Sequence, residues 1–82
     1  MIKTVICYKT NKPVIYNEGT EWESSCDHFL LFYMNRETVQ EAQAICDELN
    51  KTRPTKYCGL DIFWKKDDIK YLYASEQEEM WD

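Results

Sequence analysis

Hydrophobic and polar residues alternate near the N-terminus in a pattern typical of β-strands. Ile2–Lys9 is rich in β-branched residues on two alternating faces, and Pro13–Asn17 repeats the pattern after the polar segment Thr10–Lys12. Because such a segment supplies turn chemistry, the pattern predicts an N-terminal hairpin. Pro13 has no N–H to donate to a ladder, so we expect it at a strand start or on an edge strand.

A polar interval and an apolar run follow. Glu18–Asp27 places four acidic residues and one glycine around Trp22, which indicates a surface loop or a short irregular element. His28–Met34 is a continuous apolar run of strand length. We expect it to form a central strand that is covered on both faces.

The clearest pattern predicts a helix within the segment Asn35–Asn50. Thr38, followed three residues later by Glu41, forms a capping box that marks the start of a helix. Apolar residues then recur at three- and four-residue steps and form one stripe, made of Val39, Ala42, Ile45, Cys46 and Leu49. We expect the helix to stop at Asn50, because Pro54 forbids its continuation.

Two more alternating segments, Tyr57–Lys66 and Ile69–Ser75, predict a second hairpin that turns at Lys66–Asp68. The predicted order is therefore β-β-β-α-β-β. We expect a single α+β domain over residues 1–82, in which one helix packs on one face of an antiparallel sheet of about five strands. A helix of about three turns covers only part of such a sheet, so we expect exposed aromatic and lysine side chains.

Composition narrows the class of partner. The chain has 82 residues and a net charge of −5, which disfavours non-specific binding to nucleic acid or to an anionic membrane. No apolar run approaches the roughly 20 residues of a membrane span, and the N-terminus lacks the apolar core of a signal peptide. We therefore expect a cytoplasmic protein whose four cysteines are free thiols.

Candidate chemistry is sparse. The chain lacks the close Cys-x-x-Cys pair that zinc sites normally use, and its two glycines cannot build a phosphate-binding loop. Cys26 and His28 share a strand face and could pair as a nucleophile and its base, but the neighbouring acids would raise the pKa of the thiol. We therefore expect no metal, no cofactor and no enzymatic activity.

Acidic residues and tryptophans gather in two clusters, one in Glu18–Asp27 and the other in the tail Ser75–Asp82. The acids favour a solvated surface over a mimic of nucleic acid, because ten basic residues are interleaved. Trp81 either folds back on its own sheet or stays free for a partner. The candidate partner-binding residues are Glu21, Trp22, Glu23, Glu78, Glu79 and Trp81.

The segment Phe29–Asn50, "FLLFYMNRETVQEAQAICDELN", runs from an aromatic strand into a short, acidic, capped helix. It is similar to segments of small proteins encoded by phages and mobile elements, a group that includes anti-CRISPR proteins and other inhibitors of bacterial defence. The resemblance implies a stoichiometric inhibitor that binds a host protein or complex. It carries over no site residues.

Three hypotheses follow. The leading one is a phage-type, non-enzymatic inhibitor that presents acids and aromatics to the basic surface of a host protein complex, and that handles no nucleic acid directly. The second is a small homodimer with a structural role, formed through an uncovered aromatic sheet face or the edge strand at Pro13–Asn17. The third is a protein that sequesters a nucleotide or another small molecule between Tyr, Trp and Lys side chains.

Overall fold

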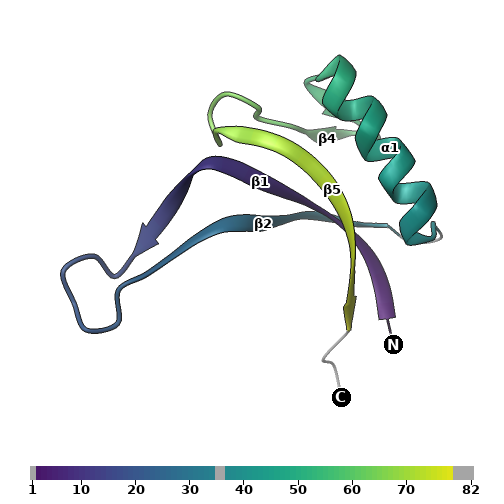
Figure 1. Cartoon of the computed structure of the whole chain (residues 1–82). Helices are drawn as coiled ribbons and strands as arrows, with labels where there is room; N and C mark the ends of the chain where they lie inside the picture. Colours follow the sequence, from purple (N-terminus) through teal and green to yellow (C-terminus); the bar gives the residue numbers. More distant parts are fainter. Residues whose placement is uncertain (1, 35–36, 79–82) are drawn as a thin grey trace.

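The longest strand, β1 (Ile2–Tyr16), forms the centre of a three-stranded antiparallel sheet in the computed structural model (Figure 1). It pairs with β2 (Ser24–Met34) on one side and with β5 (Ile69–Glu78) on the other. A second sheet pairs β3 (Lys56–Tyr57) with β4 (Leu60–Asp61). The structure describes residues 2–34 and 37–78, and the five strands and one helix of these residues confirm the α+β class. Their order along the chain is β-β-α-β-β-β.

The predicted N-terminal hairpin is wrong, because Ile2–Tyr16 is one continuous strand. The polar residues Thr10–Lys12 do not reverse the chain. They lie where the register between β1 and β2 shifts, so these polar residues form an irregularity within the strand and not a turn. The chain reverses between Tyr16 and Ser24, where Asn17 and Gly19 adopt positive φ angles of 54° and 85°.

The predicted central strand over His28–Met34 is confirmed as a strand but lies at an edge. β1 takes the centre, because β5 comes back across the sheet and places Ala74 beside Ile6. Val5 and Ile6, which face opposite sides of the sheet, are both buried, whereas Leu30 of β2 is exposed. The central position therefore belongs to the strand with two neighbours and not to the most apolar run.

The helix α1 (Val39–Thr52) begins as predicted. The Thr38 hydroxyl accepts a hydrogen bond from the Glu41 N–H at 3.3 Å, which confirms Thr38 as the N-cap. Its buried residues belong to the predicted apolar stripe: Ala42, Cys46 and Leu49. The helix ends two residues later than predicted, at a left-handed Arg53 whose N–H donates to the Leu49 carbonyl at 2.7 Å.

Polar side chains from α1 and its C-cap cover the outer edge of β5. They bond three alternate backbone positions: Lys70, Leu72 and Ala74. Asn50 makes two of these bonds, donating to the Leu72 carbonyl at 2.9 Å and accepting from its N–H at 2.6 Å. Gln43 accepts from the Ala74 N–H at 3.0 Å, and Arg53 donates to the Lys70 carbonyl at 2.8 Å. The helix thus replaces the neighbouring strand that this edge would otherwise be free to recruit.

The predicted second hairpin is also wrong. β4 stops at Asp61, residues 62–63 have no regular structure and residues 64–68 form turns in place of a strand. The indole of Trp64 donates to the Pro54 carbonyl at 2.8 Å and holds this segment against the loop that follows the helix. β5 then pairs with β1, which lies far away in the sequence. The sheet therefore depends on a non-local strand pairing.

The core lies between α1, one face of the sheet and the segment that leads into β5. The structure buries eight residues in one cluster: Ile6, Met34, Ala42, Cys46, Leu49, Ile62, Ile69 and Leu72. The helix lies mainly against β5 and less against β1. Because one helix cannot span the sheet, the far end of the β1–β2 pair stays uncovered.

Candidate partner-binding site

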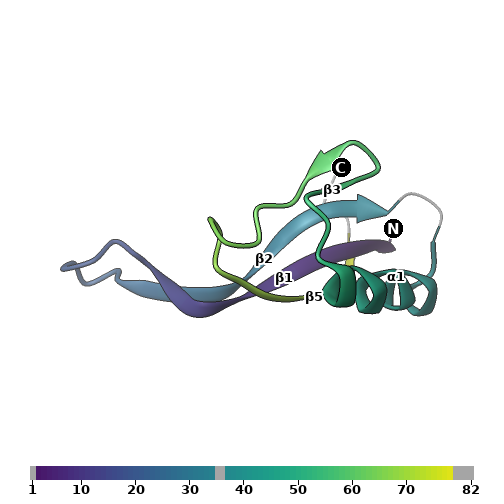
Figure 2. The ribbon, with the colours of Figure 1, turned by 90° about the horizontal axis from the view of Figure 1, so that it is seen from above.

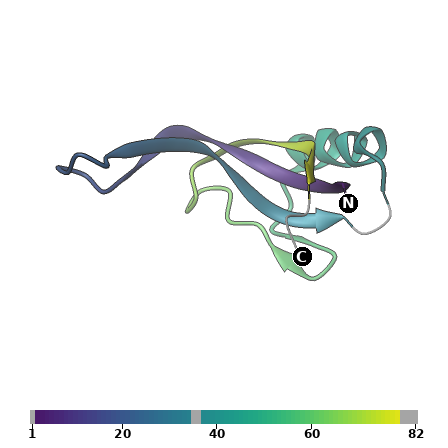
Figure 3. The ribbon, with the colours of Figure 1, turned by 90° about the horizontal axis from the view of Figure 1, so that it is seen from below.

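A two-stranded arm, residues 11–26, projects from the rest of the molecule (Figure 2, Figure 3). Pairing between β1 and β5 ends at Thr10 opposite Ile69, so beyond that point β1 pairs with β2 alone. Every residue from Asn11 to Ser25 is exposed. The arm is therefore a β-ribbon without a core, and its side chains face solvent on both sides.

The tip of the arm, residues 17–23, has a defined shape because its own groups bond one another. The Thr20 hydroxyl donates to the Asn17 carbonyl at 2.7 Å and accepts from the Trp22 N–H at 3.2 Å. The Gly19 N–H donates to the Glu23 carboxylate at 3.0 Å. The turn is thus closed by side chains as well as by backbone, and Trp22 is held on an ordered loop.

With 75% of its surface exposed, Trp22 is the most exposed large apolar residue in the described part of the chain. Among the described residues, no hydrogen bond or ring contact involves the indole of Trp22. The acidic Glu21 and Glu23 flank it in the sequence and are exposed with it. The structure therefore brings three of the six predicted contact residues together at one protruding point.

Of the three predicted contact residues in the tail, only Glu78 lies within the described residues. Glu78 ends β5 and pairs with Ile2, at the opposite end of β1 from the arm tip. Glu79 and Trp81 lie outside the described residues. Glu78 is thus not part of the arm-tip site, and the two acidic clusters do not form one surface through it.

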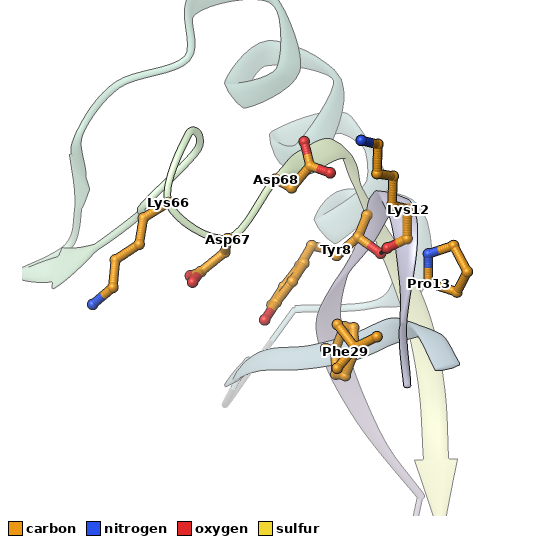
Figure 4. A pocket seen from close by; sticks show the side chains of 9 residues that line it. Tyr8, Lys12, Pro13, Phe29, Lys66, Asp67 and Asp68 are labelled. Carbon is orange, nitrogen blue, oxygen red and sulfur yellow. Dashed lines mark hydrogen bonds between the residues drawn. The ribbon is translucent and has the colours of Figure 1, made fainter. Parts of the chain in front are cut away.

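The root of the arm is fixed to the body of the protein by Asn11. Its backbone N–H donates to the Asp68 carbonyl at 2.9 Å, and its side-chain amide donates to the Asp68 carboxylate at 3.0 Å. Beside this contact lies a groove of about 380 Å³ (Figure 4). Its lining includes residues of β1 and of the turn before β5, among them Tyr8, Lys12, Pro13, Lys66, Asp67 and Asp68. Sequence reasoning missed this anchor, because Asn11 resembled an ordinary turn residue.

A polar chain of contacts crosses the sheet face that α1 leaves uncovered. Lys9 forms an ion pair with Asp27, which lies 3.2 Å from Nε2 of His28, and Nδ1 of His28 lies 3.0 Å from the Tyr73 hydroxyl. The hydrogen bond from Lys9 lowers the pKa of Asp27, and burial raises the pKa of Tyr73 to about 12. Burial likewise raises the pKa of the adjacent Cys7 thiol.

This arrangement does not form the nucleophile–base pair that Cys26 and His28 suggested. The Cys26 thiol donates to the His28 backbone carbonyl at 3.0 Å, whereas the imidazole nitrogens contact Tyr73 and Asp27. All four cysteines carry free thiols. Within residues 2–34 and 37–78, no group of three or more His, Cys, Asp or Glu side chains is arranged to hold a metal ion.

A basic, aromatic pocket lies on the body, away from the arm tip. It has a volume of about 480 Å³ and is lined by Arg53, Thr55, Ile62, Phe63, Trp64, Lys65 and Lys66. The Arg53 guanidinium sits over the Trp64 ring, 4.8 Å from its centroid, and Lys66 lies 5.2 Å from that of Phe63. Six of the ten basic residues fall within residues 51–70, so charge is segregated between this region and the acidic tip.

Neither the family models nor the curated proteins nor the solved structures compared with this chain match it. Among the described residues, no helix has the length and apolar character needed to cross a membrane.

Proposed function

We propose that the protein is a non-enzymatic binding protein whose arm tip docks on a basic surface of another protein. The proposal is supported by one observation, the 75% exposure of Trp22 on an ordered, protruding loop. Tryptophan is enriched at the energetic centre of protein interfaces, with charged residues around it. The flanking Glu21 and Glu23 suit a basic partner.

The relative energies assign a role to each residue of the tip. Burying an exposed indole removes on the order of 150 Å² of apolar surface from water, which contributes about 4 kcal/mol. An exposed ion pair contributes about 0.2–1 kcal/mol and weakens with salt. In this proposal Trp22 supplies the affinity, and the acids select the charge of the partner and speed the encounter.

The class of partner follows from the resemblance of Phe29–Asn50 to small phage and mobile-element proteins. We propose that the target is a host defence or nucleic-acid-handling complex in the bacterial cytoplasm, and that binding inhibits it. The segment that carries the resemblance lies in the body, within β2 and α1, whereas the arm lies before it in the sequence. The body would then act as a scaffold that presents the arm.

The test is capture of proteins from a bacterial lysate at low salt by the wild-type chain and by two variants. Trp22→Ala removes the proposed anchor, and Phe63→Ala removes an aromatic that is 50% exposed outside the arm. We expect a retained protein that Trp22→Ala loses and Phe63→Ala keeps, with retention falling as salt rises. The proposal would be contradicted if both variants retained the same protein equally, or if no protein were retained at low salt.

A second candidate function is sequestration of an anionic aromatic small molecule such as a nucleotide. It is favoured by the pocket at Phe63, which joins aromatic rings to the cations of Arg53, Lys65 and Lys66 with no acid in its lining. Stacking on a ring combined with phosphate contacts to cations is a common way to hold a nucleotide. A thermal-shift screen should then show stabilisation of the wild type by nucleotides and none of Lys66→Ala.

A further inference from the structure

Two parts of the molecule carry opposite charge, and each exposes an aromatic ring. The arm tip, residues 17–23, contains three glutamates and no basic residue. The basic, aromatic pocket on the body has no acid in its lining and three cations: Arg53, Lys65 and Lys66. Trp22 is 75% exposed at the tip, and Phe63 is 50% exposed in the pocket. The tip therefore complements the pocket in charge, and each offers a ring that the other can pack against.

The cations of the pocket keep their charge available, because the acids close to them in the sequence are engaged elsewhere. Asp61 forms an ion pair across the β3–β4 ladder, Asp68 accepts a hydrogen bond from the arm root, and Asp67 lines the groove at that root. Within the described residues, Lys65 and Lys66 have no ion-pair partner. An acidic ligand would therefore meet cations that these residues leave unpaired.

The tip does not fill the pocket of its own chain. The arm projects away from the body, and no residue of the tip belongs to the pocket lining (Figure 1, Figure 2). Two hydrogen bonds from Asn11 to Asp68 fix the arm at its root. The pocket volume of about 480 Å³ lies within the range of about 300–1,000 Å³ that holds drug-sized ligands, so it has room for one indole. A second copy of the chain carries the acids and the indole that this pocket suits.

We propose that the arm tip of one copy of this chain docks in the basic, aromatic pocket of a second copy. Trp22 then packs against the ring of Phe63, and Glu21 and Glu23 face the cations of the pocket. This inference rests on the docking role proposed for the tip and names a second, competing partner for it. Association hides Trp22, so a copy of the chain opposes the binding of any other partner at the tip.

The position of the pocket suits a reciprocal dimer. Lys66 lines both the pocket and the groove at the arm root, so the pocket lies toward the root end of the arm. Each tip of a two-fold pair then reaches toward the root of the other arm, and two identical contacts close the dimer.

Sedimentation velocity of the full chain over a series of concentrations tests the proposal. We expect the wild type to associate, and its dissociation constant to rise about thirtyfold in Trp22→Ala, as for a central interface tryptophan. Lys65→Glu combined with Lys66→Glu should raise it by about tenfold or more, because acids then face acids. The matched control is Lys51→Glu combined with Lys70→Glu, which changes the net charge equally at exposed positions outside the pocket lining.

Mixing the two kinds of variant tests the pairing of tip with pocket. Trp22→Ala keeps an intact pocket, and the Lys65→Glu, Lys66→Glu variant keeps an intact tip. We expect an equimolar mixture to form a heterodimer at concentrations at which neither variant associates alone, because one of the two contacts is restored. The proposal is overturned by a wild type that stays monomeric throughout, by a control variant weakened as much as the pocket variant, or by a mixture no stronger than either variant.

The outcome is separable from that of the proposed function. A monomeric wild type overturns self-docking, but it leaves capture of a lysate protein through Trp22 intact and leaves the pocket to another occupant such as a nucleotide. A wild type that associates as expected but captures no lysate protein contradicts the proposed function alone.

Discussion

Two tryptophans in the described part of the chain illustrate opposite uses of the same side chain. The indole of Trp64 donates to the Pro54 carbonyl, carries the Arg53 guanidinium over its ring and packs against the core. Trp22 has none of these contacts and stands in solvent at the arm tip. At the residue scale, Trp64 therefore holds the body together, whereas Trp22 is available to a partner.

Cysteine reactivity should separate buried from exposed thiols. Cys46 is fully buried, and burial raises the pKa of its thiol to about 12, whereas Cys58 is exposed in the turn between β3 and β4. Because the thiolate is the reactive form, we expect Cys58 to be labelled first and Cys46 only on unfolding. The measurement is the rate of modification by a disulfide reagent near pH 8, with Cys58→Ser as the control. Fast labelling of Cys46 in the folded chain would contradict the buried stripe.

The ion pair between Lys9 and Asp27 should make stability depend on acid pH. The Lys9 hydrogen bond lowers the pKa of Asp27 in the folded state, so its contribution is present above the ordinary carboxyl pKa of about 3.9 and is lost as pH falls through the lowered value. We expect Asp27→Asn to be less stable than the wild type at pH 6 and the difference to shrink below about pH 4. Urea unfolding at several pH values measures this difference.

The control for this pH dependence is Glu18→Gln, which removes an exposed carboxylate that has no ion pair among the described residues. It should show no comparable convergence with the wild type as pH falls. A difference between Asp27→Asn and the wild type that stays constant down to pH 3 would mean that the pair does not stabilise the fold.

At the scale of elements, the fit of α1 along the edge of β5 sets one stability prediction. Asn50→Ala leaves the Leu72 N–H and carbonyl without their side-chain partner, so we expect the free energy of unfolding to fall by about 1–3 kcal/mol. Gln40→Ala on the exposed helix face should change it by less than about 0.5 kcal/mol. Urea unfolding followed by circular dichroism gives both values. Equal effects of the two substitutions would show that Asn50 does not cap the strand.

The helix could be predicted from the sequence because its signals are local. The Thr38 capping hydrogen bond and the stripe through Ala42 and Cys46 lie within the element itself. The predicted stop at Asn50 was wrong because a tertiary role, the bonds to Leu72, holds this residue inside the helix. Local patterns thus predicted the helix, and a long-range contact decided where it ends.

The strand arrangement could not be predicted in the same way, because pairing is decided between distant segments. Thr10–Lys12 has turn chemistry, but Asn11 bonds Asp68 and this contact keeps the strand running into the arm. The alternation near Trp64 resembles a strand, yet its indole bonds Pro54 and the segment forms turns. In both cases a contact far away in the sequence overrode the local pattern.

The candidate site was only partly predictable. Glu21, Trp22 and Glu23 could be singled out because acids around a tryptophan in a polar stretch have little chance of burial, and the structure places them together at the tip. That Glu78 lies at the far end of β1 depends on how β5 pairs, which the sequence does not encode locally. The basic pocket beside Trp64 was missed, because its members meet only when the chain folds.

At the scale of the whole molecule, a folded body and a bare arm are separate parts with different charge. The largest dimension of the molecule is 41 Å and the smallest is 20 Å, and the arm projects along its length (Figure 2). Six basic residues lie within 51–70 on the body, whereas the tip carries Glu18, Glu21 and Glu23. The body contains the buried core, whereas the arm exposes four large apolar side chains: Val14, Ile15, Tyr16 and Trp22.

The central claim is that the arm tip is the contact point for a partner, and radical footprinting of the complex with the captured protein tests it most directly. Oxidation of Trp22 and Phe63 is compared in the free chain and in the complex, since both side chains are at least half exposed when free. The account predicts that oxidation of Trp22 falls severalfold while that of Phe63 is unchanged. Protection of Phe63 with Trp22 still fully reactive would contradict it.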